Sequence, residues 1–156
     1  MSIKAEAEAF LAQQRIAVVG MSRKKGTGNA IFKALRKRGH EVFPVNPNAS
    51  EIDGETCYPD LKAIPDGVGA AIIVTSPETT EEVVRDCVEA GVSHVWMHYN
   101  ALFGSKLSSV SDTATEYCRE NGIEVIPGGC PLMFGEGADF GHRCMRWWLG
   151  FRGKLP

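Results

Sequence analysis

The sequence has no long hydrophobic run, and this absence excludes a membrane-spanning protein. No stretch of apolar residues approaches the roughly 20 that an α-helix needs to cross a bilayer. Residues 1–8 are acidic and interrupted, unlike a secretory signal peptide. We therefore expect a cytoplasmic protein with no membrane partner.

The sequence also has little net charge and no pattern of metal ligands. Its formal net charge is −2 at pH 7, which gives no overall attraction to nucleic acid. The five cysteines are odd in number and far apart, so they fit neither a disulfide framework nor a paired zinc site. No serine lies in a nucleophile elbow, and no carboxylate pair is placed by motif for acid–base catalysis. We expect no metal ion, no nucleic-acid partner and no catalytic residue.

What the sequence does contain is an alternation of short apolar strands with helices. At 156 residues, with 44% hydrophobic and 23% charged residues, we expect one packed domain spanning residues 1–156. The run at 70–74 is unbroken and apolar, as in a strand covered by helices on both faces. Glycines end the helices that precede the later strands. The predicted strands are 16–19, a segment ending at 47, 70–74, 93–97 and 123–126.

This alternation predicts an α/β fold with three layers. Right-handed crossovers through helices give a five-stranded parallel sheet, most simply ordered 3-2-1-4-5, with helices on both faces. We expect a helix within residues 1–14 before the first strand and an aromatic helix at 138–151 after the last. In such a sheet the ligand binds outside the carboxyl ends of the strands, beside strand one.

The loop after the first strand is the segment most informative about function. The strand ends in Gly20 and the loop leads into a helix starting near Asn29, so backbone N–H groups and a helix dipole point to one spot. Ser22 adds a hydroxyl, and three consecutive cations add charge-assisted contacts. We interpret the loop as a phosphate site, although it matches neither G-x-G-x-x-G nor G-x-x-x-x-G-K-[ST]; the alternative is a solvated basic loop. The cations are Arg23, Lys24 and Lys25.

The end of the second strand narrows the class of ligand. An NAD site places an acidic residue there to accept hydrogen bonds from the ribose, but this strand ends Asn46-Pro47-Asn48. A ligand with an additional phosphate on its adenosine ribose suits the three cations better, because they neutralise a charge that a carboxylate would repel. Coenzyme A and NADP both meet this description.

Several short motifs occur in a characteristic order along the chain. They are Ile16 to Gly20, Ser22, Pro44-Val45-Asn46-Pro47, Gly54 with Cys57-Tyr58-Pro59, Ile64-Pro65, Val95-Trp96 and Cys130-Pro131. This series resembles the CoA-binding domain proteins, which are small stand-alone relatives of the nucleotide-binding domain of succinyl-CoA synthetase alpha subunits. The match covers most of residues 15–131.

The resemblance implies a Rossmann-like fold that holds coenzyme A across the strand ends. We therefore expect a coenzyme A or acyl-CoA binding protein without catalytic activity of its own. The alternative is an NADP-dependent reductase or a nucleotide-responsive redox sensor. Carried over by position, the phosphate region is lined by Gly20, Ser22, Arg23 and Lys24, the adenosine is bordered by Asn46 and Pro47, and Thr75, Ser76 and Pro77 lie beneath the nucleotide.

Two further side chains are candidates for ligand contact. His98 follows the fourth strand and could touch the ligand there. Cys130 follows the fifth strand, where its thiol could face the cleft and form a mixed disulfide with coenzyme A. The alternative is a turn cysteine that packs under Trp96 or Tyr99.

The C-terminal segment is rich in aromatic residues. Phe140, Trp147, Trp148 and Phe151 fall near one face of the predicted helix, with arginines among them. One interpretation is packing on the sheet or on the N-terminal helix. The other is a partner surface that forms a homodimer, since aromatic and arginine residues are favoured at interfaces.

Overall fold

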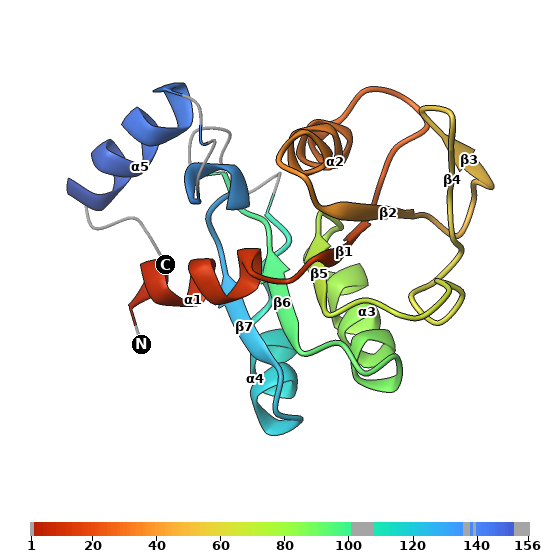
Figure 1. Cartoon of the computed structure of the whole chain (residues 1–156). Helices are drawn as coiled ribbons and strands as arrows, with labels where there is room; N and C mark the ends of the chain where they lie inside the picture. Colours follow the sequence, from red (N-terminus) through yellow and green to blue (C-terminus); the bar gives the residue numbers. More distant parts are fainter. Residues whose placement is uncertain (1, 101–107, 136–137, 139, 152–156) are drawn as a thin grey trace.

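Five parallel strands form the central sheet (Figure 1). The computed structural model describes residues 2–100, 108–135, 138 and 140–151. The strands are arranged in the order β2-β1-β5-β6-β7, and Val18 of β1 lies opposite Pro44 on one side and Ile72 on the other. Their bounds are Arg15–Val19 for β1, Glu41–Val45 for β2, Ala70–Ile73 for β5, His94–Met97 for β6 and Glu124–Pro127 for β7. The predicted five-stranded parallel sheet is confirmed.

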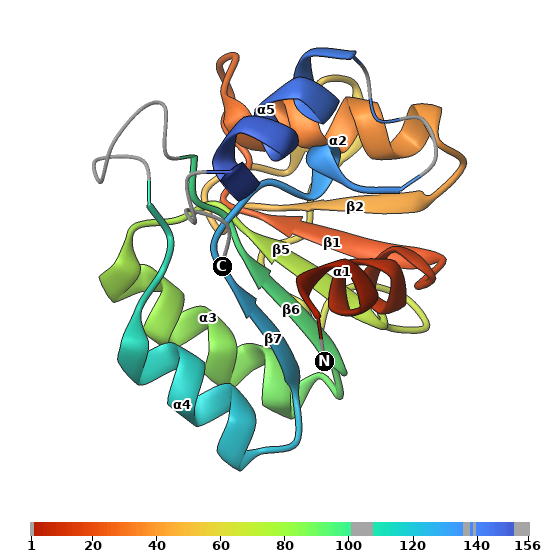
Figure 2. The same cartoon turned by 90° about the vertical axis from the view of Figure 1, so that its left-hand side faces the viewer.

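Helices cover both faces of the sheet, which gives the three layers visible in Figure 2. On one face lie α1 (Ile3–Leu11), α2 (Thr27–Lys37), the short 3-10 helix η2 (Pro131–Met133) and α5 (Phe140–Phe151). On the other face lie α3 (Pro77–Glu89) and α4 (Asp112–Glu120). The helices expected within residues 1–14 and 138–151 are therefore present, as α1 and α5.

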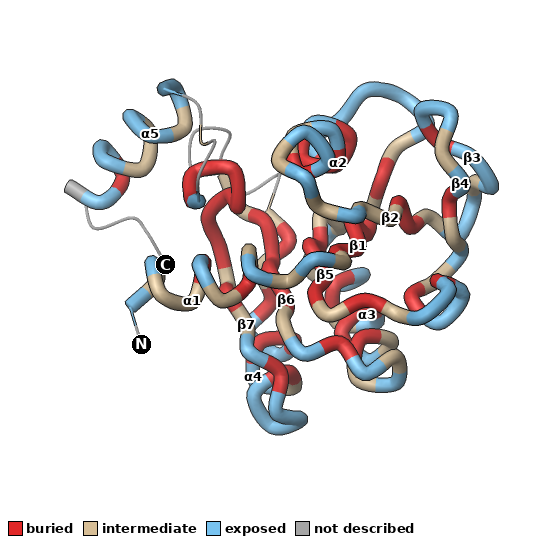
Figure 3. The backbone as a smooth tube through the Cα atoms, in the orientation of Figure 1, coloured by how far each residue is buried: buried red, intermediate tan, exposed pale blue. Residues whose placement is uncertain are grey.

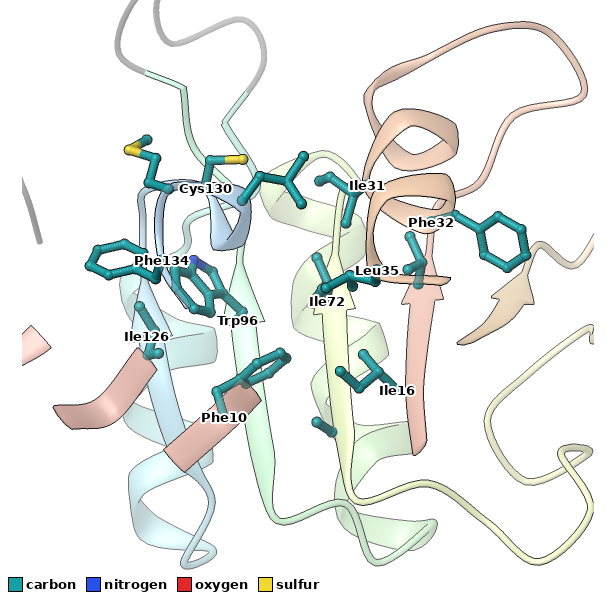
Figure 4. Packing of buried hydrophobic residues seen from close by; sticks show 14 of the residues in the cluster. Phe10, Ile16, Ile31, Phe32, Leu35, Ile72, Trp96, Ile126, Cys130 and Phe134 are labelled. Atoms are coloured by element: carbon teal, nitrogen blue, oxygen red, sulfur yellow. The ribbon is translucent and has the colours of Figure 1, made fainter. Parts of the chain in front are cut away.

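Each face of the sheet packs its own apolar core, because the strands are buried on both sides (Figure 3). On the face covered by α1 and α2, the ring of Trp96 packs edge-on against Phe10 of α1, with ring centres 5.4 Å apart. The ring centre of Phe134, beside η2, lies 5.6 Å from that of Trp96 (Figure 4). The indole Nε1 of Trp96 donates to the Gly128 carbonyl at 2.8 Å, so the only polar atom of the ring is satisfied. The aromatic cluster holds α1 and the segment after β7 against the sheet.

The predicted position of the third strand in the sheet is wrong. The prediction placed 70–74 beside the second strand, whereas β5 lies beside β1, giving 2-1-3-4-5 in place of 3-2-1-4-5. The free edge of β2 is occupied instead by Tyr58, whose N–H donates to the Pro44 carbonyl and whose carbonyl accepts from Asn46 N, both at 2.9 Å. Pro44 lacks an N–H and therefore suits an edge strand, while the fully buried β5 needs a neighbour on each side.

A two-stranded hairpin between β2 and β5 is not among the predicted elements. It consists of β3 (Glu51–Ile52) and β4 (Glu55–Thr56), and it lies beside α2. Its turn residues Asp53 and Gly54 have φ values of 54° and 79°, as a two-residue type I′ turn requires. The Asp-Gly pair is a strong hairpin signal that the sequence carries.

No helix in the described ranges is long and apolar enough to cross a membrane.

Candidate functional site

A cavity of about 590 Å³ opens at the carboxyl ends of β2, β1 and β5, on the face covered by α3. This is the point where strand order reverses, because the chain passes from β1 to β2 on one side and returns to β5 on the other. Ligands of open α/β sheets bind at this position. Five of the predicted site residues line the cavity, namely Gly20, Asn46, Pro47, Thr75 and Ser76.

Gly20 is the residue that lets the first loop turn close to the neighbouring strand. Its φ is 96°, and its N–H donates to the Val45 carbonyl at 3.1 Å. A Cβ at this position would lie 2.9 Å from the carbonyl oxygen of Val74. Gly28 near the start of α2 is under a similar constraint, since its Cβ would lie 2.9 Å from Cγ2 of Val74. The two glycines therefore bring the β1 loop, the start of α2 and the end of β5 together.

Asn46 connects the loops that follow β1 and β2. Its Nδ2 donates to the Met21 carbonyl at 2.7 Å, and its Oδ1 accepts from the backbone N–H of Asn48 at 2.7 Å. The amide is thus used to hold the cavity wall in shape. Pro47, which follows it, is exposed at the rim.

The segment Thr75-Ser76-Pro77 forms the opposite wall and starts α3. Ser76 is the N-cap and its Oγ accepts from Thr79 N at 3.4 Å, while Pro77 is the first helical residue. The hydroxyl of Thr75 lies 3.0 Å from that of Thr80. These hydroxyls order the wall, and of the three predicted residues only Pro77 does not line the cavity.

The three predicted cations are exposed on the loop that leads into α2, next to the cavity. Among the described residues, no carboxylate lies within ion-pair distance of Arg23, Lys24 or Lys25. The N-cap of α2 is Gly26, which has no side chain to accept from the first N–H groups of the helix. The first N–H groups of α2 and the loop cations are therefore placed to receive an anion.

Asn29, the predicted helix-start residue, shapes the loop from within. It is buried, its Oδ1 accepts from Ser22 N at 3.2 Å, and its Nδ2 donates to the Ser22 carbonyl at 2.9 Å. Nδ2 also donates to the Asp53 carboxylate at 3.1 Å, and Lys33 lies 3.3 Å from the same oxygen. The hydrogen bond from Asn29 lowers the pKa of Asp53, and Lys33 adds to the effect. Asp53 was not predicted, because its contact with Asn29 joins positions far apart in the chain.

The outer wall of the cavity is acidic, which the sequence analysis also did not anticipate. Asp60, Glu82 and Asp86 line it. Burial raises the pKa of Asp86, and the carboxylates of Asp60 and Glu82 contribute in the same direction. Carboxylates at this end accept hydrogen bonds from hydroxyl or amino groups and repel phosphate. A nucleotide is therefore expected to point its phosphates towards the Gly20 loop.

His98 lies at the carboxyl end of β6 and is 3% exposed. Its backbone N–H donates to the Ile73 carbonyl at 2.9 Å, which continues the pairing of β6 with β5. Burial lowers the pKa of His98 to about 4, so the ring is neutral at pH 7. The cavity wall, as far as the structure describes it, does not include His98. No group of three or more metal-binding side chains occurs within the described part of the chain.

Cys130 lies at the start of η2 and is 4% exposed. It belongs to the same apolar cluster as Trp96, and Figure 4 shows the two residues near each other. This position agrees with the alternative of a packed turn cysteine. Like His98, it is not among the described residues that line the cavity, so its mixed disulfide with coenzyme A stays a prediction.

Comparison with known proteins identifies related sequences over most of the chain. A family model described as CoA binding domain matches residues 14–136. The ADP-forming acetate–CoA ligase II of Archaeoglobus fulgidus is 34% identical over 116 residues, which cover 71% of this chain and 17% of the ligase. The uncharacterized protein YneT of Bacillus subtilis is 29% identical over 129 residues, which cover 81% of this chain and 90% of YneT. The chain spans 11% to 29% of the length of the ADP-forming ligases and ligase subunits that it matches.

A similar fold is found among solved structures. A hypothetical protein from Pyrococcus horikoshii superimposes with a TM-score of 0.74 and 28% sequence identity. The superposition covers 83% of this chain and 87% of that protein. The Rossmann-like architecture is therefore shared over most of both chains.

Proposed function

This chain belongs to the CoA binding domain family, and from this premise we propose that it binds coenzyme A or an acyl-CoA at the carboxyl edge of the sheet. The single observation that carries the proposal is the cavity at the point where strand order reverses, beside a helix with a glycine N-cap and a loop with three exposed cations. This arrangement combines space for a nucleoside with donors for its phosphates.

The geometry supports one orientation of the ligand. The diphosphate lies on the Gly20 loop and the first turn of α2, within reach of the cations. The adenosine lies in the cavity between the Asn46-Pro47 segment and the Thr75-Ser76 segment. The acidic outer wall at Asp60 and Asp86 favours this orientation, because it repels phosphate and accepts hydrogen bonds from sugar and base.

We assign the protein no reaction of its own. The amide and hydroxyl side chains of Asn46, Thr75 and Ser76 on the cavity wall are engaged in hydrogen bonds that hold the loops, as for Asn46 with Met21 and Thr75 with Thr80. Such side chains support a binding role more than a role in proton transfer or nucleophilic attack. The name of the ligase relative specifies CoA as a reactant, which supports the ligand class.

The phosphate site is tested by removing its cations together. We expect Arg23→Ala/Lys24→Ala/Lys25→Ala to weaken coenzyme A binding at least roughly tenfold in isothermal titration calorimetry, because charge-assisted contacts to phosphate are lost. The matched control is Lys4→Ala/Lys37→Ala/Arg85→Ala, which removes the same charge from exposed positions elsewhere. An equal loss of affinity in both variants would show a general charge effect and contradict the assigned phosphate site.

The ligand itself is tested with a panel of coenzyme A, acetyl-CoA, dephospho-CoA, NAD and NADPH in a thermal-shift assay. Coenzyme A and acetyl-CoA are expected to raise the melting temperature most, since a ligand that binds only the folded state stabilises it. Stabilisation by NADPH with no response to coenzyme A would instead support the NADP-dependent reductase or redox sensor.

A further inference from the structure

The β3–β4 hairpin contacts the loop between β1 and α2 indirectly, through the carboxylate of Asp53 and the side chain of Asn29. Asp53 sits at the turn of the hairpin, and its Oδ2 accepts from Asn29 Nδ2 at 3.1 Å. The same Nδ2 donates to the Ser22 carbonyl, while Oδ1 of Asn29 accepts from Ser22 N. Three residues from separate segments thus form one continuous chain of hydrogen bonds.

The Ser22 backbone and the Asp53 carboxylate together fix which way the Asn29 amide faces. An amide has two N–H donors on one atom and an acceptor on the other, and here the donors point to the Ser22 carbonyl and to Asp53. A carboxylate only accepts, so it holds the NH₂ group on its own side and leaves Oδ1 to receive the Ser22 N–H. Without Asp53 the amide keeps its two hydrogen bonds with Ser22 but loses the third, so the Asn29 side chain is held less firmly and the loop around Ser22 is less well ordered.

The hairpin is docked by other contacts as well, so Asp53 is not its only anchor. Ile52 is 3% exposed and belongs to the core beneath α2. Glu55, on the second strand of the hairpin, forms an ion pair with Arg36 of α2. The location of the hairpin and the hydrogen bond to Asn29 can therefore be perturbed separately.

We propose that Asp53 is a positioning residue for ligand binding: its hydrogen bond to Asn29 holds the Ser22 loop in the shape that receives phosphate. The proposal rests on the proposed function for its effect on coenzyme A. It makes the hairpin a part of the binding site, although the hairpin lines no part of the cavity wall that the structure describes.

The test separates the carboxylate from the turn that carries it. Asp53→Gly removes the carboxylate but accepts the positive φ of 54° without strain, and Asp53→Asn keeps an acceptor and also tolerates this conformation. Glu55→Gln weakens the ion pair of the hairpin with Arg36 without touching Asn29. Each variant is measured for coenzyme A affinity by calorimetry and for hydrogen exchange of the Ser22 amide by NMR.

We expect Asp53→Gly to speed exchange of the Ser22 amide and to weaken coenzyme A binding about threefold to tenfold, the range of one net hydrogen bond. Asp53→Asn should keep both the exchange rate and the affinity close to those of the unmodified protein. Glu55→Gln should change neither quantity. The proposal is overturned if Asp53→Gly leaves both measurements unchanged, if Asp53→Asn restores neither, or if Glu55→Gln has the effect of Asp53→Gly. If the unmodified protein binds no coenzyme A, the proposed function fails, while the exchange of the Ser22 amide still decides whether Asp53 holds the loop.

Discussion

Two glycines with nearly the same backbone conformation have different surroundings. Gly20 has a φ of 96° and Gly39 a φ of 95°, so each occupies a region that other residues avoid. Gly39 ends α2 with no atom within 4 Å of its missing Cβ, whereas Gly20 lies beneath the backbone of Val74. Gly39 is therefore constrained by conformation alone, and Gly20 by conformation and close approach.

This difference predicts the effect of adding one methyl group. Gly39→Ala should lower the free energy of unfolding by about 1 to 2 kcal/mol through backbone strain. Gly20→Ala should lower it by at least about 1 kcal/mol more, because its Cβ would lie 2.9 Å from the Val74 carbonyl oxygen. Urea denaturation of both variants measures the difference. Equal losses would mean that the β5 end moves aside at little cost.

Among the elements, α5 exposes several of its aromatic residues. Of its described side chains Leu149 is the buried one, at 2% exposure, while Phe140 is 81% and Trp147 is 73% exposed. The helix lies against η2, and the guanidinium of Arg146 is 5.6 Å from the ring centre of Phe134. The helix therefore packs on η2 through Leu149, while Phe140 and Trp147 are largely exposed, which is compatible with the alternative of a partner surface. The side chain of Phe151 lies outside the described residues.

Burial predicts which side chain of α5 stabilises the protein. Leu149→Ala should lower the free energy of unfolding by about 2 kcal/mol or more, because a buried methyl-rich side chain is replaced by a cavity. Phe140→Ala, at the start of the same helix, should change it by less than about 0.5 kcal/mol, since its side chain is 81% exposed and exposed side chains contribute little. Chemical denaturation of the two variants checks this order, and a larger loss for Phe140→Ala would contradict it.

The homodimer expected through α5 stays a prediction. Light scattering gives the mass of the unmodified protein and of Trp147→Ala in solution. A dimer that dissociates in the variant would support the expectation, and a monomeric unmodified protein would rule it out.

For the whole molecule, the buried His98 makes stability depend on pH. The unfolded chain binds a proton at His98 near the ordinary pKa of 6.5, whereas burial lowers the pKa in the folded state to about 4. Between these values the unfolded state binds more protons, so the free energy of unfolding falls as the pH drops. From pH 7.5 to pH 5 the expected loss from this residue is about 2 kcal/mol.

The measurement compares urea denaturation at the two pH values. His98→Gln should remove most of the loss, since it has no group that titrates in this range. His94→Gln, at the other end of β6, is the control, because His94 is a histidine of the same region that is only partly buried. A pH dependence unchanged by His98→Gln would place its origin elsewhere in the molecule.

The periodicity of apolar residues determined most of the local structure and the general location of the site. Unbroken apolar runs such as Ala70–Ile73 predicted strands buried on both faces, and glycines marked the ends of helices. The turn at Gly20 could be predicted because a strand followed by glycine and a basic loop has a local geometric meaning. Such patterns can be recognised in the sequence because they reflect interactions between residues that are close together in the chain.

The tertiary structure alone decided the strand order and the contacts within the site. The order depends on what covers the edge of β2, and that edge is paired with Tyr58, which local periodicity does not report. The hydrogen bond between Asn29 and Asp53 likewise joins a helix to a hairpin that are placed side by side only when both pack on the sheet. These features come from burial and hydrogen bonding between segments that are distant in the sequence. Such interactions stabilise the protein only once folding has brought the segments together.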